Sequence, residues 1–62
     1  MATTLTGTYQ ELETLMAEFE LNHAKHTLGN KAAGRRARTN LNEIRKLVTT
    51  YRKASVMKDK NG

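Results

Sequence analysis

The segment Thr27-Leu28-Gly29-Asn30-Lys31-Ala32 decides how this chain of 62 residues folds. A glycine just beyond a helix readily takes the left-handed conformation that ends it, and an asparagine can cap the helix that follows. We therefore expect a turn at Gly29-Asn30 between one helix over residues 5–28 and a second over residues 31–58, with a frayed tail at 59–62.

Apolar residues on both sides of the turn recur at alternating steps of three and four, which is the spacing of one helix face. The face comprises Leu5, Tyr9, Leu12, Met16, Phe19, His23 and His26 before the turn, and Gly34, Ala37, Leu41, Ile44, Val48 and Tyr51 after it. When the chain is folded at Asn30, residues whose numbers add to 60 face each other, so His26 meets Gly34 and Met16 meets Ile44. These antiparallel pairings predict an all-α fold, a coiled-coil-like two-helix hairpin, as a single domain over residues 1–62.

Two local alternatives remain open. Thr8 followed by Glu11 fits a capping box and predicts a helix start there, whereas the apolar Leu5 favours a start near Thr4. The chain also fits one unbroken helix, because the apolar pattern continues through the turn. The Gly29-Asn30 pair and the polar stretch 22–40 favour the hairpin.

A lone hairpin of this length leaves half of each helix exposed and buries little apolar surface. The sequence contains no cysteine, so disulfides cannot compensate. Leu15 and Leu47 widen the apolar face of both helices beyond a narrow seam. We therefore expect two hairpins to associate as a homodimer that forms a four-helix bundle.

Charge is divided unevenly between the two halves. Residues 1–28 contain four glutamates and one lysine, a net charge of −3, whereas residues 29–62 contain ten Lys or Arg and two acids, a net charge of +8. In the second half Lys31, Arg38, Arg45 and Arg52 fall seven apart and form one stripe on a helix. Such a segregated basic surface suits a polyanion, and nucleic acid is the first candidate.

The candidate binding residues form an arc of the 31–58 helix beside its apolar face. They are Lys31, Arg35, Arg38, Arg45, Lys46, Arg52 and Lys53, with Arg36 on the opposite flank of the core. Four of these cations crowd the first two turns, where the helix dipole disfavours positive charge and free backbone N–H groups can receive phosphate. The start of this helix is therefore the sharpest candidate site.

Neighbouring residues predict two further features. The small side chains at 32–34 and 37 would let a nucleic-acid backbone approach closely. Across the hairpin, Glu20 is expected near Arg38 and Glu13 near Arg45. Both arginines would then brace the two helices as well as meet phosphate.

Other function classes lack support in the sequence. No apolar stretch approaches the roughly 20 residues of a membrane span, and the N-terminus lacks the basic start and apolar run of a secretion signal. No nucleophile–base set or Gly-rich phosphate loop is visible, so we expect no enzyme, catalytic residue, cofactor or small-molecule substrate. His23 and His26 are three apart, as in a metal half-site, but packing is the favoured interpretation and no metal is expected.

A family resemblance appears in the run Gly29-Asn30-Lys31-Ala32-Ala33-Gly34-Arg35-Arg36-Ala37-Arg38-Thr39, followed by Tyr51-Arg52-Lys53-Ala54-Ser55. These residues resemble the linker-histone-like proteins of bacteria, typified by the chlamydial histone-like family. The resemblance covers mainly residues 29–58. It implies a nucleoid-associated protein of the bacterial cytoplasm that binds double-stranded DNA through Lys31, Arg36, Arg38, Arg52 and Lys53. Helix position alone nominates Arg35, Arg45 and Lys46.

The family's long Lys/Ala-rich tail has no counterpart in the residues up to Gly62. The resemblance therefore implies that an oligomer coats, bridges or wraps DNA, rather than that single molecules condense it. Only Tyr9, Phe19 and Tyr51 are aromatic, and all three fall on the predicted core face, so no platform for stacking bases is expected.

The sequence predicts sequence-tolerant DNA binding through the phosphate backbone, which helps to organise or compact the chromosome. Two alternatives remain open. One is an RNA-binding helical hairpin regulator, and the other is a coiled-coil module whose Arg-rich face docks on an acidic protein.

Overall fold

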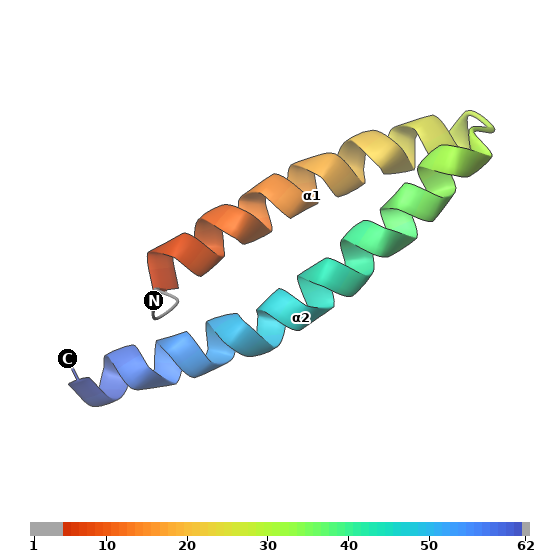
Figure 1. The fold of residues 1–62 in the computed structure, drawn as a ribbon. Helices are drawn as coiled ribbons and strands as arrows, with labels where there is room; N and C mark the ends of the chain where they lie inside the picture. The colour runs from red at the N-terminus through yellow and green to blue at the C-terminus, as the bar shows by residue number, and fades with distance from the viewer. Residues whose placement is uncertain (1–4, 62) are drawn as a thin grey trace.

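The computed structural model describes residues 5–61, which form an antiparallel helical hairpin (Figure 1). Helix α1 spans Leu5–Thr27 and helix α2 spans Lys31–Asn61, and the two helices pack against each other. The molecule is a rod with principal dimensions of 48 × 18 × 14 Å. The hairpin prediction is confirmed, and the alternative of one unbroken helix is wrong.

The turn has the capping geometry that its sequence predicts. Gly29 has a φ of +102°, a left-handed conformation that costs glycine little. Its N–H donates to the His26 carbonyl at 2.9 Å, and the Asn30 N–H donates to the Lys25 carbonyl at 3.1 Å, which together form a Schellman motif. The Asn30 side-chain oxygen then accepts a hydrogen bond from the Ala33 N–H at 2.9 Å and so caps α2.

The outer helix ends differ in part from expectation. Because α1 begins at Leu5, Thr8 lies inside the helix, where it is buried, and the predicted capping box is wrong. The alternative start at Thr4 lies outside the described residues. Helix α2 continues through Asn61, beyond the predicted helix end at residue 58, while Gly62 lies outside the described residues. Lys58 and Lys60 in the last turn favour this extension, because they complement the negative end of the helix dipole.

The contact between the helices is built from a series that we call the inward residues. They are buried or half-buried and recur at steps of four and three. They comprise Thr8, Leu12, Leu15, Phe19 and Asn22 on α1, and Ala33, Ala37, Asn40, Ile44 and Leu47 on α2. The core is therefore small and partly polar, and it is narrowest near the turn, where alanines bring α2 close to α1.

The predicted seam is wrong at alternate positions. Tyr9, Met16, Leu41 and Val48 were expected between the helices, but they are 45–53% exposed. The residue immediately before each of them points inward instead. The two inward asparagines provide a physical reason, because they hydrogen-bond to each other across the hairpin and so hold this rotation.

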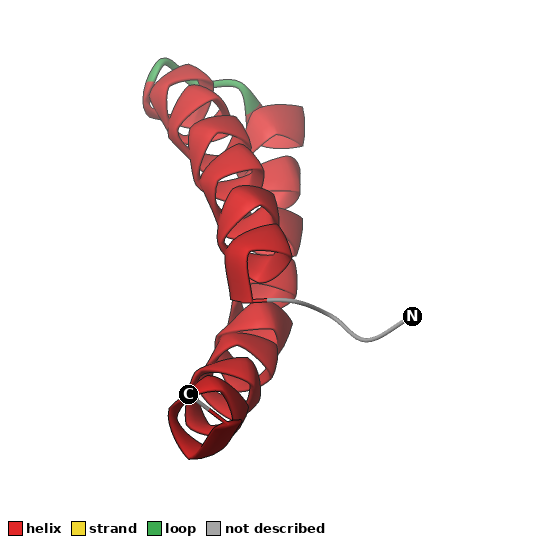
Figure 2. Ribbon diagram, turned by 90° about the vertical axis from the view of Figure 1, so that its left-hand side faces the viewer, coloured by secondary structure: helices red, strands yellow, loops and turns green. Residues whose placement is uncertain are grey.

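Among the aromatic side chains Tyr9 follows this rotation, whereas Tyr51 continues the inward series four residues after Leu47. Phe19 is half-buried as expected, whereas Tyr9 is 52% and Tyr51 is 36% exposed, so the prediction that all three lie in the core is wrong for the tyrosines. In the view of Figure 2 the described helices form a single layer, and no further element covers either flank of the hairpin.

Candidate nucleic-acid interface

The basic side chains are free to meet a ligand. Every Lys and Arg of the chain is exposed. Within residues 5–61, Arg36 is the one cation whose side chain has a hydrogen-bond or ion-pair partner. The field of the second half of the chain is therefore not neutralised by the glutamates of α1.

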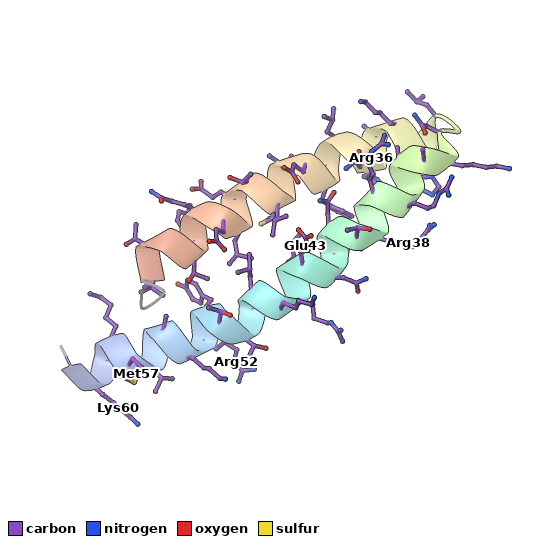
Figure 3. All side chains as sticks on the ribbon, in the orientation of Figure 1. Arg36, Arg38, Glu43, Arg52, Met57 and Lys60 are labelled. Atoms are coloured by element: carbon purple, nitrogen blue, oxygen red, sulfur yellow. The ribbon has the colours of Figure 1, made fainter. Side chains whose placement is uncertain are left out.

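Most of the predicted binding residues lie on the side of α2 that faces away from α1. With about 100° between successive residues, this outer side carries Lys31, Arg35, Lys46 and Lys53, bordered by Arg38, Arg45 and Arg52. Figure 3 shows Arg38 and Arg52 pointing away from α1. Residues 31 to 53 cover about 33 Å of helix axis at 1.5 Å per residue. That length is close to one turn of duplex DNA, roughly 34–36 Å.

Arg36 occupies a different environment. Its side chain lies on the α1 side of α2 (Figure 3), where Nε donates to Asn22 Oδ1 at 3.2 Å. Asn22 Nδ2 donates to Asn40 Oδ1 at 2.9 Å, and Asn40 Nδ2 donates to Glu18 Oε2 at 3.2 Å. We call these four residues the polar network. The prediction that Arg36 lies on a separate flank is confirmed.

Sequence reasoning missed the polar network. The signal that could have found it is the pair of asparagines, each one residue before the expected seam, whose numbers add to 62 and so fall close to the register expected for a fold at Asn30. Asn40 is only 7% exposed, and both its amide oxygen and its amide nitrogen have a hydrogen-bond partner. A buried polar pair of this kind fixes helix rotation and register.

The small residues at the start of α2 serve the hairpin. Ala33, Gly34 and Ala37 are buried, so the expectation that they admit a nucleic-acid backbone is wrong for these three positions. The predicted meeting of His26 with Gly34 is confirmed, since a Cβ placed on Gly34 would lie 2.6 Å from His26 Cε1.

The start of α2 is already capped, which changes how it could bind phosphate. The Ala33 N–H donates to Asn30, so that amide is occupied. The exposed side chains of Lys31, Arg35 and Arg38 are left as the main donors around this helix end. Any anion here would be held by guanidinium and ammonium groups more than by the backbone.

The expected braces between the helices do not form within one chain. In the described region, no ion pair joins Glu20 to Arg38 or Glu13 to Arg45. The four side chains are all exposed. This part of the prediction is wrong because the rotated seam turns these residues outward.

Other candidate sites are sparse among the described residues. His23 stacks on Phe19, with ring centroids 6.0 Å apart and planes at 23°. Residues 5–61 hold no group of three or more His, Asp or Glu side chains arranged for a metal ion. None of the described helices is both long and apolar enough to cross a membrane.

A comparison with protein families places the chain beside a known family. The model of the family described as histone H1-like protein Hc1 matches residues 6–61. The match therefore includes α1 as well as the basic α2. The resemblance recognised in the sequence covered mainly residues 29–58. No curated protein and no solved structure matches the chain.

Proposed function

Because the chain belongs to the family of histone H1-like proteins Hc1, we propose that it binds double-stranded DNA and helps to organise the bacterial nucleoid. The observation that carries the proposal is the outer side of α2, where exposed cations have no partner within the described chain. The family membership supports a histone-like role without catalysis, in the cytoplasm where the nucleoid lies.

The contacts are proposed to be made to the phosphate backbone. The binding residues are Lys31, Arg35, Arg38, Arg45, Lys46, Arg52 and Lys53, with Arg36 as a minor contributor because its Nε is held by Asn22. Lysine and arginine on one rigid rod can follow a run of phosphates, which carry no sequence information. Binding is therefore sequence-tolerant and strongly dependent on salt.

The active form is proposed to be a homodimer that makes a four-helix bundle. A compact monomer of 7.0 kDa exposes about 4,000 Å² by the scaling of surface with mass. The hairpin exposes 5043 Å². The excess is comparable to the roughly 800 Å² that each partner buries in a standard protein interface. Such a dimer would bridge or coat DNA with two basic faces and thereby help to compact the chromosome.

Titration of random-sequence duplexes at several salt concentrations tests DNA binding. If each chain neutralises about four phosphates, log K falls against log salt with a slope near −7 for the dimer. Affinity that does not respond to salt, or a strong preference for one duplex sequence, would overturn the proposal. A folded RNA competitor that displaces the duplex efficiently would assign the basic face to RNA instead.

A further inference from the structure

The two flanks of the hairpin can be told apart by helix geometry. Each residue advances about 100° around its helix, so residues that precede inward positions turn to one flank and residues that follow them turn to the other. Glu18 and Arg36 precede inward residues, and the polar network places them on the same flank. Glu11 and Glu43 also precede inward residues, and they line one groove together.

The residues that follow inward positions therefore share the opposite flank, which we call the open flank. It carries Tyr9, Glu13, Met16 and Glu20 from α1, and Arg38, Leu41, Arg45 and Val48 from α2. The apolar members are half exposed and lie nearest the contact between the helices. The glutamates border them on the α1 side and the arginines border them on the α2 side.

The open flank is unsatisfied in a single chain. Its four large apolar side chains are 45–53% exposed. No ion pair links its carboxylates to its guanidiniums within residues 5–61. The open flank is an apolar strip with glutamates along one edge and arginines along the other. Two such flanks are complementary when the acidic edge of each copy faces the basic edge of the other.

We propose that a second copy of the chain covers the open flank, with its α2 lying over α1 of the first copy. This inference rests on the homodimer proposed above and names its interface. A two-fold axis parallel to the helices brings the acidic edge of each copy onto the basic edge of the other. An axis across the helices would place glutamates on glutamates and arginines on arginines, which like-charge repulsion disfavours.

The register of the hairpin specifies which charges meet. A parallel two-fold axis keeps each residue at its own height along the rod. Within one hairpin Asn22 lies opposite Asn40, and His26 lies opposite Gly34. Side chains also bridge positions whose numbers add to 58, as Asn22 does with Arg36 and Asn40 does with Glu18. Glu20 and Arg38 of the second copy stand in this same relation, and so do Glu13 and Arg45. The pairs that fail to form within one chain therefore form between two chains.

This arrangement sets the direction of the DNA-binding faces. The two α2 helices lie at diagonal corners of the bundle, so their outer sides point in opposite directions. Lys31, Arg35, Lys46 and Lys53 stay outside the interface on both copies and carry most of the phosphate contacts there. Arg38 and Arg45 lie at the border of the interface, where they pair with glutamates of the second copy and contribute less to DNA binding. The dimer then presents one basic face to each of two duplexes, which favours bridging over wrapping.

Sedimentation in the absence of DNA tests the interface separately from DNA binding. Met16→Glu adds a charge to the apolar strip and is expected to raise the dimer dissociation constant by at least about tenfold. Leu21→Glu is the matched control, because Leu21 is similarly exposed, at 58% against 53%, but lines a hollow beside the polar network. A wild-type chain that stays at 7.0 kDa across the concentration range, or equal effects of both variants, would overturn the interface.

Disulfide trapping tests the relative placement of the two copies. The substituted positions are exposed, so the variants are expected to fold as the wild-type hairpin does. The chain has no cysteine, so single cysteines can be introduced cleanly. Glu20→Cys mixed with Arg38→Cys is expected to give a cross-linked heterodimer, whereas either variant alone gives little. Efficient cross-linking of Glu20→Cys with itself would support the crossed axis and overturn the proposed arrangement. Absence of cross-links in the mixture would overturn it as well.

Discussion

The two flanks of the hairpin use the same kinds of residue to different ends. On one flank Glu18, Asn22, Arg36 and Asn40 satisfy one another in a continuous chain of hydrogen bonds. On the open flank glutamates and arginines of equal number remain unpaired around exposed apolar side chains. The first flank is complete in one chain, whereas the second has the composition of an interface.

The residues that stabilise the hairpin are therefore different from the residues that are exposed for binding a partner. Rotation of α1 against α2 is fixed by the polar network and by the small residues near the turn. The large apolar side chains of the open flank remain about half exposed. Stability of the single chain is therefore low, and association adds the missing burial.

Replacement of Asn40 is expected to have the largest effect on the hairpin. Asn40→Ala removes the acceptor of the Asn22 Nδ2 hydrogen bond and the donor to Glu18 Oε2, and we expect a loss of about 1–3 kcal/mol in the free energy of unfolding. Leu41→Ala, at the next residue, should mainly weaken association of the two chains, so its effect on stability should depend on chain concentration. Urea denaturation at several chain concentrations measures both, and matching behaviour of the two variants would contradict the distinction between the flanks.

Replacement of Gly29 probes the turn that aligns both flanks. At a φ of +102° an alanine is strained although no atom lies within 4 Å of its Cβ, so Gly29→Ala is expected to cost about 1–2 kcal/mol. Gly29→Asn should cost less, because asparagine tolerates the left-handed region. Thermal unfolding followed by circular dichroism compares the two variants, and equal losses would argue against backbone strain as the cause.

Gly34 and His26 offer a double-mutant cycle at the closed end of the hairpin. Alanine favours a helix over glycine by roughly 1 kcal/mol, but a Cβ at Gly34 collides with the His26 ring. Gly34→Ala alone should therefore stabilise by less than this amount, and the full gain should appear in the His26→Ala background. Additive effects in urea denaturation would mean that the ring moves aside without cost.

DNA affinity should respond to position as well as to charge. Lys46→Gln removes one cation from the outer side of α2 and is expected to reduce the magnitude of the salt slope by about 0.9 for each phosphate that the variant no longer neutralises. Lys25→Gln removes the same charge from α1 and is the matched control, while Arg36→Gln should affect folding more than DNA binding. Fluorescence anisotropy with a labelled duplex measures all three, and equal slopes for Lys46→Gln and Lys25→Gln would move the binding face off α2.

The turn and the two-helix hairpin could be predicted from the sequence. Gly29 and Asn30 have strong local preferences that do not depend on the rest of the fold, and both capping roles are confirmed. The pairing of His26 with Gly34 followed from the position of the turn and the complementary sizes of the two residues.

Helix rotation was not predictable from the apolar pattern. The apolar face of each helix is wider than one neighbour can cover, so two rotations bury similar amounts of apolar surface. The choice between them rests on Asn22 and Asn40, which look like surface residues in sequence and form a hydrogen bond only when they face each other. The expected Glu13–Arg45 and Glu20–Arg38 pairs do not form within residues 5–61, because the rotation turns these side chains out of the hairpin.

The tight turn at Gly29 also bears on how quickly the protein assembles. In a hairpin, contacts close to the turn join residues near in sequence, and each later contact closes only a slightly longer loop. Such a low contact order favours folding in microseconds to milliseconds. The chain has no proline, so slow peptide-bond isomerisation does not intervene. Association of two chains would then be the slowest step in forming the bundle, and its rate would depend on the local concentration of the chains on DNA.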